Sequence, residues 1–414
     1  MPCRRGVLPV ERPQRPFKYR RIAYSLHACR AGAGRQGCTG ATAHDEGTDI
    51  KREWLLAAGS VLFTVVAAVS LLRWLAPQLL GIPADLQLVQ ASETVPPFFE
   101  NIFREQDFAG EGLLLHDPYT NIRFRPLLPA DGSSGPHDML GFRNSGIPNH
   151  PAVIVIGDSQ TYGIGEPFAH NWPSQLAALL QDGDSVYSMA IGGWGAVQYL
   201  DMAGKAIRLQ PQTLIIAFYT GNDPLDAFAT AYGNDHWQSL RIEPELDKTD
   251  APEIGNLLSV EDAWPVRFSD GTYIVFTPRG RLTVNDTGYP AVRTGYAIMA
   301  EVARRIAALA REHDISVVFT IIPTRELVYA GKVTQAQLDA PETYRQLVRM
   351  EQENIASLAG SIRSLPGARY VDLVQPLQAA ALTDAALYPR QWDGHPGRQG
   401  YAVIARTVAQ AVSP

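Results

Sequence analysis

Short apolar runs alternate with stretches of helical periodicity along the C-terminal two thirds of the chain. Continuous runs of branched apolar residues are typical of strands buried on both faces of a parallel sheet. Such runs predict strands at 153–157, 185–189, 213–219, 316–322 and 369–373. Apolar spacing of three and four residues predicts helices at 171–180, 196–209, 291–312, 342–364 and 401–412. This alternation predicts an α/β fold: a three-layer α/β/α sandwich around a mostly parallel sheet, with right-handed crossovers.

The alternation is interrupted at about 224–289. Two strand-like runs within 266–276 are joined through Asp270-Gly271, which is a strong signal for a β-hairpin. Residues 281–284 are a candidate third strand. We expect this insertion to lie over the carboxyl ends of the sheet and to shape a pocket there, although a flap remote from any site fits the same pattern.

Residues 54–72 are 19 consecutive residues without a formal charge, bounded by charged residues on both sides. This length is enough to cross a bilayer, and the run is apolar around most of a helix, unlike an amphipathic core helix. The organisation we predict is a basic, disordered cytoplasmic lead at 1–52, a transmembrane helix at 53–75, a linker and lead-in at 76–150, and an α/β domain at 151–414.

Charge is distributed unevenly along the chain. Residues 1–52 hold eleven Lys and Arg against four Asp and Glu, so they carry +7, and the rest of the 414-residue chain carries −13. The positive-inside rule keeps the basic lead in the cytoplasm and predicts an extracytoplasmic body, which is periplasmic in a bacterium. An acidic body argues against binding nucleic acid.

Cysteine and histidine usage argues against a disulfide framework in the body and against a metal site. All three cysteines, Cys3, Cys29 and Cys38, lie in the basic lead, so the body has no disulfide framework. Neither cysteine nor histidine spacing forms a metal signature, and we expect no metal and no cofactor. Nothing in the sequence predicts the oligomeric state.

Chemistry-bearing residues follow the predicted strands. Gly157-Asp158-Ser159 ends the first strand, where open α/β sheets place their ligands, so Ser159 is a candidate nucleophile; a plain helix cap is the alternative. Trp392-Asp393-Gly394-His395-Pro396 offers His395 as the base and Asp393 as the acid that orients it, or else a surface loop.

Two more segments offer donors for an oxyanion. Ala190-Ile-Gly-Gly-Trp-Gly195 brings the backbone close to a ligand, so the Gly193 amide is a candidate donor, and a simple turn is the alternative. Thr220-Gly221-Asn222-Asp223 ends the third strand, and the Asn222 side-chain amide either donates to an oxyanion or closes an Asx turn.

Read together, these four segments resemble the blocks of the SGNH hydrolases, also called GDSL esterases and lipases. The resemblance covers about residues 140–414 and implies an SGNH/flavodoxin-like fold. It further implies Ser159 as nucleophile, His395 as base, and an oxyanion hole of the Ser159 amide, the Gly193 amide and the Asn222 side chain. Two departures are visible: Trp392 occupies the usual position of the acid, and Gln160 follows the serine where an apolar residue is common.

Residues 322–329, Ile-Pro-Thr-Arg-Glu-Leu-Val-Tyr, are similar to a stretch of SGNH-type proteins that O-acetylate exported polysaccharides. That likeness makes Arg325 a candidate substrate-binding residue at the rim of the site, and pairing of Arg325 with its neighbours is the alternative. Our leading expectation is a membrane-anchored serine esterase acting on an acylated carbohydrate or lipid. An O-acyltransferase and a non-catalytic SGNH-fold binding protein are the two alternatives.

Overall fold

A computed structural model describes residues 114–180, 186–252, 263–383, 387–390 and 394–412. Its central sheet has five strands in the order β4-β3-β5-β8-β9, and every neighbouring pair is parallel. The strands are β3 (Val153–Gly157), β4 (Val186–Ser188), β5 (Thr213–Tyr219), β8 (Ser316–Ile322) and β9 (Ala368–Asp372). The predicted α/β fold with a mostly parallel sheet is confirmed, and the strand order is that of flavodoxin-like folds.

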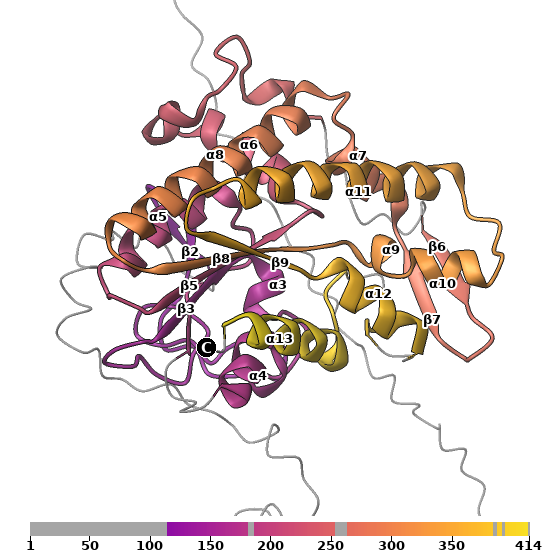
Figure 1. The fold of residues 1–414 in the computed structure, drawn as a ribbon, viewed down its shortest axis with the longest axis horizontal. Coiled ribbons are helices and arrows are strands. Elements are labelled where there is room, and N and C mark those ends of the chain that lie inside the picture. Colours follow the sequence, from indigo (N-terminus) through magenta and orange to yellow (C-terminus); the bar gives the residue numbers. More distant parts are fainter. Residues whose placement is uncertain (1–113, 181–185, 253–262, 384–386, 391–393, 413–414) are drawn as a thin grey trace, which may run out of the picture. The chain divides into compact units, whose positions relative to one another are not determined.

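Helices cover both faces of this sheet (Figure 1). Side chains alternate along each strand, so Ile154 and Ile156 pack into one core and Val153 and Val155 into the other. The first core contains α5 (Ala196–Ile207), α6 (Asp223–Gly233), α8 (Pro290–Glu312) and α11 (Glu342–Arg363). The second contains α4 (Trp172–Leu179), α12 (Val374–Thr383) and α13 (Arg398–Val412). Three layers result, as the alternation predicts.

A lead-in hairpin precedes the sheet, formed by β1 (Leu114–Asp117) and β2 (Asn121–Phe124). After it, the buried guanidinium of Arg143 donates to the carbonyl oxygens of Gly163, Tyr162 and Glu166. These bonds anchor the segment that follows β3. Further short helices in the described part of the chain are α3 (Ser159–Tyr162), η3 (Phe168–His170), η5 (Asp235–Leu240), η6 (Lys248–Asp250), α9 (Arg325–Val328) and α10 (Ala330–Gln335).

The insertion contains the expected hairpin and one element of a different kind. Strands β6 (Trp264–Arg267) and β7 (Tyr273–Phe276) pair antiparallel. The predicted third strand at 281–284 is wrong, because these residues belong to helix α7 (Pro278–Asn285). Pro278 stands in the first turn, where its missing N–H costs nothing, and Arg281, Val284 and Asn285 are buried at helical spacing.

The basic lead at 1–52 and the predicted membrane helix at 53–75 lie outside the described residues. Within the part of the chain that the structure describes, no helix combines the length and the apolar character that crossing a bilayer requires.

Candidate active site

Ser159 lies at the carboxyl end of β3, on a tight turn into α3. Asp158 caps this turn, since its Oδ1 accepts from the Gln160 amide at 2.9 Å. A side chain at Gly157 would overlap Thr161, and Gly163 ends the turn in the left-handed region with φ of +83°. The turn therefore holds the half-buried Ser159 in a defined position at the edge of the sheet.

His395 stands in the loop before α13 and reaches Ser159 across the fold. Its Nε2 lies 2.8 Å from Ser159 Oγ, within hydrogen-bond distance. Gly394 and Pro396 on either side are buried, and the imidazole itself is half-buried. A neutral imidazole in this place can take the hydroxyl proton as the oxygen attacks a carbonyl.

The glycine segment after β4 abuts the serine. Gly193 adopts a left-handed φ of +85°. Among the described residues, neither the Ser159 amide nor the Gly193 amide donates to a protein acceptor. Both amides are thus available to a ligand oxygen, as an oxyanion hole requires.

Apolar side chains surround this glycine segment. A Cβ placed on Gly192 would lie 3.5 Å from Ser159 Cβ, 3.2 Å from Ile164 Cδ1 and 3.7 Å from Phe124 Cζ. A Cβ on Gly193 would lie 3.2 Å from Ile122 Cδ1. The space next to the serine is therefore lined on this side by the apolar side chains of Ile164, Phe124 and Ile122.

Asn222 follows β5 and begins α6, on the strand next to the one that carries Ser159. Its Nδ2 donates to Asp226 Oδ2 at 2.5 Å. An amide nitrogen carries two hydrogens, so one is held by Asp226 and the other remains for a ligand. Asp226 thereby fixes the orientation of the Asn222 amide.

Three carboxyl groups lie near the serine and the asparagine: Asp158 and Asp223 are fully buried, and Asp226 is half-buried. Burial raises the pKa of Asp158 to about 6, although the Gln160 amide and the nearby His395 act in the opposite direction. Burial and the neighbouring Asp158 raise the pKa of Asp223. Burial raises the pKa of Asp226 to about 7, although the Asn222 hydrogen bond lowers it. Burial therefore raises the pKa of all three carboxyl groups above the usual aspartate value.

The remaining residues singled out from the sequence are Asp393, Arg325 and Gln160. Asp393 lies outside the described residues. Arg325 is 1 % exposed, and its Nε is 3.7 Å from Glu326 Oε1, so its guanidinium is inside the protein rather than at an open rim. Gln160 is also buried and does not line the mouth of the site.

Sequence reasoning missed Asp226 as part of the site. The available signal was its spacing, because a carboxylate four residues after Asn222 lies one turn along the same helix. Asp158 was visible in the Gly-Asp-Ser triplet, but its burial against the serine was not: its Oδ2 lies 3.4 Å from Ser159 Oγ.

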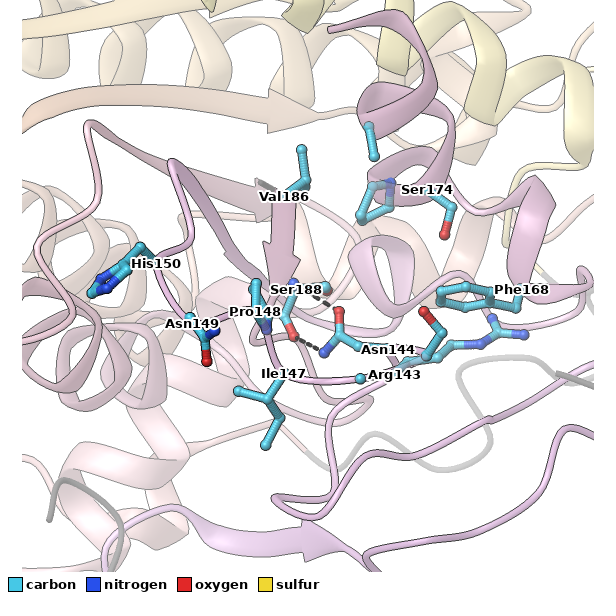
Figure 2. Close-up of a pocket in the computed structure, with 14 residues that line it drawn as sticks. Arg143, Asn144, Ile147, Pro148, Asn149, His150, Phe168, Ser174, Val186 and Ser188 are labelled. Atoms are coloured by element: carbon cyan, nitrogen blue, oxygen red, sulfur yellow. Dashed lines mark hydrogen bonds between the residues drawn. The ribbon is translucent and has the colours of Figure 1, made fainter. Parts of the chain in front are cut away.

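A pocket of about 660 Å³ lies away from this site, at the outer edge of β4. Figure 2 shows Asn144 at its centre, bonded to both main-chain groups of Ser188. Ser159 and His395 are not among its lining residues. This pocket is therefore separate from the serine and the histidine.

Comparisons with known proteins identify the family. A family model described as the GDSL-like lipase/acylhydrolase family matches residues 155–403, which is more than half of the chain. A search of curated proteins finds no similar sequence. The matched range spans the positions of Ser159, Gly193, Asn222 and His395.

Several solved structures are distantly similar. TesA is 14 % identical with a TM-score of 0.33, over 63 % of this chain and 98 % of that one. A catalytic mutant of Axe2, an acetylxylan esterase from Geobacillus stearothermophilus, is 12 % identical with a TM-score of 0.32, over 64 % and 94 %. The psychrotrophic esterase EstA from Pseudoalteromonas sp. is 10 % identical with a TM-score of 0.31, over 63 % and 96 %. Similarity this distant does not assign a function to the chain, and the assignment rests on the family model.

The chain belongs to the GDSL-like lipase/acylhydrolase family, and the protein is an ester hydrolase.

Proposed function

We propose that this protein is a membrane-anchored, extracytoplasmic serine esterase that removes a short O-acyl group from a carbohydrate or lipid through an acyl-Ser159 intermediate. The observation that carries the proposal is the 2.8 Å contact between His395 Nε2 and Ser159 Oγ. The two residues are far apart in sequence, so the fold itself brings base and nucleophile together.

The reaction proceeds in two halves. Ser159 Oγ bonds to the ester carbonyl carbon while His395 Nε2 takes its proton, and the carbonyl electrons move onto oxygen. The amides of Ser159 and Gly193 and the second Asn222 hydrogen donate to this oxyanion. Collapse breaks the bond to the alcohol, which leaves with the proton from His395. Water then attacks the acyl-serine while His395 takes a proton from the water. Collapse breaks the bond from the acyl carbon to Ser159 Oγ, His395 returns the proton to Oγ, and the acid is released.

A short acyl group fits the surroundings of Ser159. Ile164 and Phe124 stand near Gly192, beside the nucleophile, and Ile122 stands near Gly193. Side chains in these places limit the room for an acyl chain next to the oxyanion donors. This supports an acetyl-sized group over a long fatty acyl chain.

The proposed location is supported by the sequence. The uncharged run at 54–72 has the length of a membrane span, and the basic residues before it favour a cytoplasmic N-terminus. The acidic body then faces outward, where acylated envelope carbohydrates and lipids are available as substrates.

The test uses the purified full-length protein, Ser159→Ala and His395→Ala, with p-nitrophenyl acetate and an acetylated oligosaccharide. We expect release of acetate by the parent protein and a loss of at least about a thousandfold in either variant. Equal rates in all three proteins would exclude this site and favour a non-catalytic role for it.

Two further experiments identify the acyl acceptor and the acid that orients His395. Acetyl transfer to an added unacetylated oligosaccharide, faster than release to water, would make the protein an O-acyltransferase that uses the same acyl-serine. Asp393→Asn is expected to lower kcat, because Asp393 would orient the imidazole and stabilise its cation. Unchanged activity in that variant would assign the acid to another carboxylate.

A further inference from the structure

Helix α7 of the insertion contacts the loop that carries Asn222. Arg281 Nη1 donates to the carbonyl oxygen of Gly221 at 2.7 Å, and Asn285 Nδ2 donates to that of Thr220 at 3.1 Å. These carbonyls belong to the two residues immediately before Asn222. Arg281 is 7 % exposed and Asn285 is fully buried. The main chain from which the Asn222 amide extends is therefore held by two side chains of α7.

Arg281 also adjoins the histidine loop. A Cβ placed on Gly394 would lie only 2.7 Å from Arg281 Nη2. The guanidinium carbon lies 5.6 Å from the centre of the Tyr219 ring, at the end of β5. One guanidinium thus lies between the residue before Asn222 and the residue before His395.

Other elements hold α7 in place. Tyr296 of α8 donates from its hydroxyl to Asn285 Oδ1 at 2.6 Å, and Asn354 of α11 donates to the Asn285 carbonyl at 2.8 Å. The hydrogen bond from the charged Arg281 guanidinium to the Gly221 carbonyl oxygen is also stronger than one from a neutral donor. The helix is therefore a rigid support rather than a loose cover.

We propose that Arg281, backed by Asn285, is a positioning residue that sets the relative placement of the Asn222 amide and the His395 imidazole. The inference rests on the proposed function, in which both groups act on one tetrahedral intermediate. A misplacement of about 1 Å at a reacting centre costs on the order of a hundredfold in rate. Loss of the Arg281 bond is therefore expected to lower kcat and to leave KM within about twofold.

The first experiment measures kcat and KM for p-nitrophenyl acetate with the full-length protein. Arg281→Met keeps much of the side-chain volume and removes the donor, and we expect kcat to fall by about tenfold to a hundredfold. Arg281→Lys should recover part of this loss, because an ammonium group can still donate to the Gly221 carbonyl. Arg279→Met, at an exposed position of the same helix, is the matched control and should match the parent.

The second experiment tests the link between the two loops. In Gly394→Ala, the new methyl group meets Arg281 Nη2 and should displace the guanidinium, lowering kcat as Arg281→Met does. When Arg281→Met is already present, adding Gly394→Ala should change kcat by less than about twofold. Losses that multiply in the double variant would overturn the proposed link.

The other outcomes also decide the inference. A kcat for Arg281→Met within about twofold of the parent, in a protein whose activity depends on Ser159, would refute the positioning role and leave the proposed function standing. A raised KM with unchanged kcat would instead assign Arg281 to substrate binding. Should Arg281→Met fail to fold, Arg281→Lys and Gly394→Ala decide: unchanged kcat in both overturns the inference. A parent protein without Ser159-dependent turnover would remove the proposed function, and this inference with it.

Discussion

Asp226 places a carboxyl group directly behind the Asn222 amide. When both hydrogens of that amide are used, Asp226 and a substrate oxyanion lie roughly 5 Å apart, by ordinary hydrogen-bond geometry. At an effective dielectric constant of 20, two unit negative charges at this distance repel by about 3 kcal/mol. The neutral acid orients the amide without this repulsion, so the protonation state of Asp226 matters to the reaction.

Asp226→Asn is therefore expected to change the pH profile. The pKa of Asp226 is raised by burial to about 7, so the parent carries the negative charge at pH 9 and much less of it at pH 6. The Asn side chain still accepts from Asn222 and never ionises. We predict that the ratio of kcat at pH 9 to kcat at pH 6 is on the order of tenfold higher in the variant, once screening reduces the repulsion.

The control for this measurement is Asp235→Asn, because Asp235 is an exposed acid paired with Arg241. It should reproduce the parent profile. Identical ratios in the parent and in Asp226→Asn would show that the charge on Asp226 does not reach the reacting oxygen.

Ile164→Ala tests the apolar wall beside the nucleophile. Ile164 Cδ1 and Ser159 Cβ both lie close to Gly192, so shortening Ile164 opens room next to the acyl carbon. We predict that kcat/KM for a hexanoyl ester, relative to an acetyl ester, rises about tenfold. Leu179→Ala, at an exposed position of α4, should leave this ratio unchanged. A parent enzyme that already prefers hexanoyl esters would refute the short-acyl assignment.

At the scale of elements, the strands were predictable and α7 was not. Continuous apolar runs such as those of β3, β5 and β8 have few interpretations besides buried parallel strands. The four residues Arg281-Leu-Thr-Val284 satisfy a strand pattern as well as a helical one. What decides between them is the burial of Arg281 and Asn285 against a loop sixty residues earlier in the chain, which local pattern does not contain.

The residues of the candidate site also fall into those that the sequence predicts and those that it does not. Ser159 follows a recognisable strand and His395 precedes a recognisable helix, and both stand in the order of sequence blocks known from the family. They were therefore predictable from the sequence. Asp226 and Arg281 were not, because their roles depend on contacts with Asn222 and with the Gly221 carbonyl. Arg325 was placed at the rim by likeness alone, and the structure buries it.

Glu351 of α11 ties together the segments that follow β5 and β8. Its carboxyl group accepts from Thr220 after β5 and from both the amide and the hydroxyl of Thr324 after β8. It is fully buried, and burial raises its pKa to about 7 although these hydrogen bonds lower it. The folded protein therefore binds this proton more tightly than the unfolded chain does.

Glu351→Gln should alter how stability depends on pH. A raised carboxyl pKa contributes stability that is fully present below the ordinary value near 4.5 and is lost as pH rises through about 7. Gln keeps the acceptor for Thr220 and the Thr324 amide, and it does not titrate. We predict that the free energy of unfolding of the parent falls between pH 5 and pH 8 by up to about 3 kcal/mol more than that of the variant, measured by denaturant titration.

Glu342→Gln is the matched control on the same helix, since Glu342 is exposed and paired with Arg345. Its stability should follow the parent between pH 5 and pH 8. If parent, Glu342→Gln and Glu351→Gln share one slope, the buried carboxyl group is not the source of the pH dependence.

At the scale of the whole molecule, the account requires an anchor and an outward-facing body. We predict that the full-length protein stays in the membrane fraction after a high-salt wash. Protease added to intact spheroplasts should digest the catalytic domain and spare an epitope tag at residue 1. Recovery of the protein in the soluble fraction, or protection of the catalytic domain, would contradict this arrangement.

The central claim is that Ser159, activated by His395, carries the acyl group. Its most direct test is to quench the full-length protein within milliseconds of mixing with an activated acetyl ester and to map the acetyl group by peptide mass spectrometry. The account predicts an acetyl adduct on Ser159 that accumulates in the burst, that is absent in Ser159→Ala and that forms far more slowly in His395→Ala. Sustained ester hydrolysis with the acetyl group on another residue, or with Ser159 never modified, would contradict it.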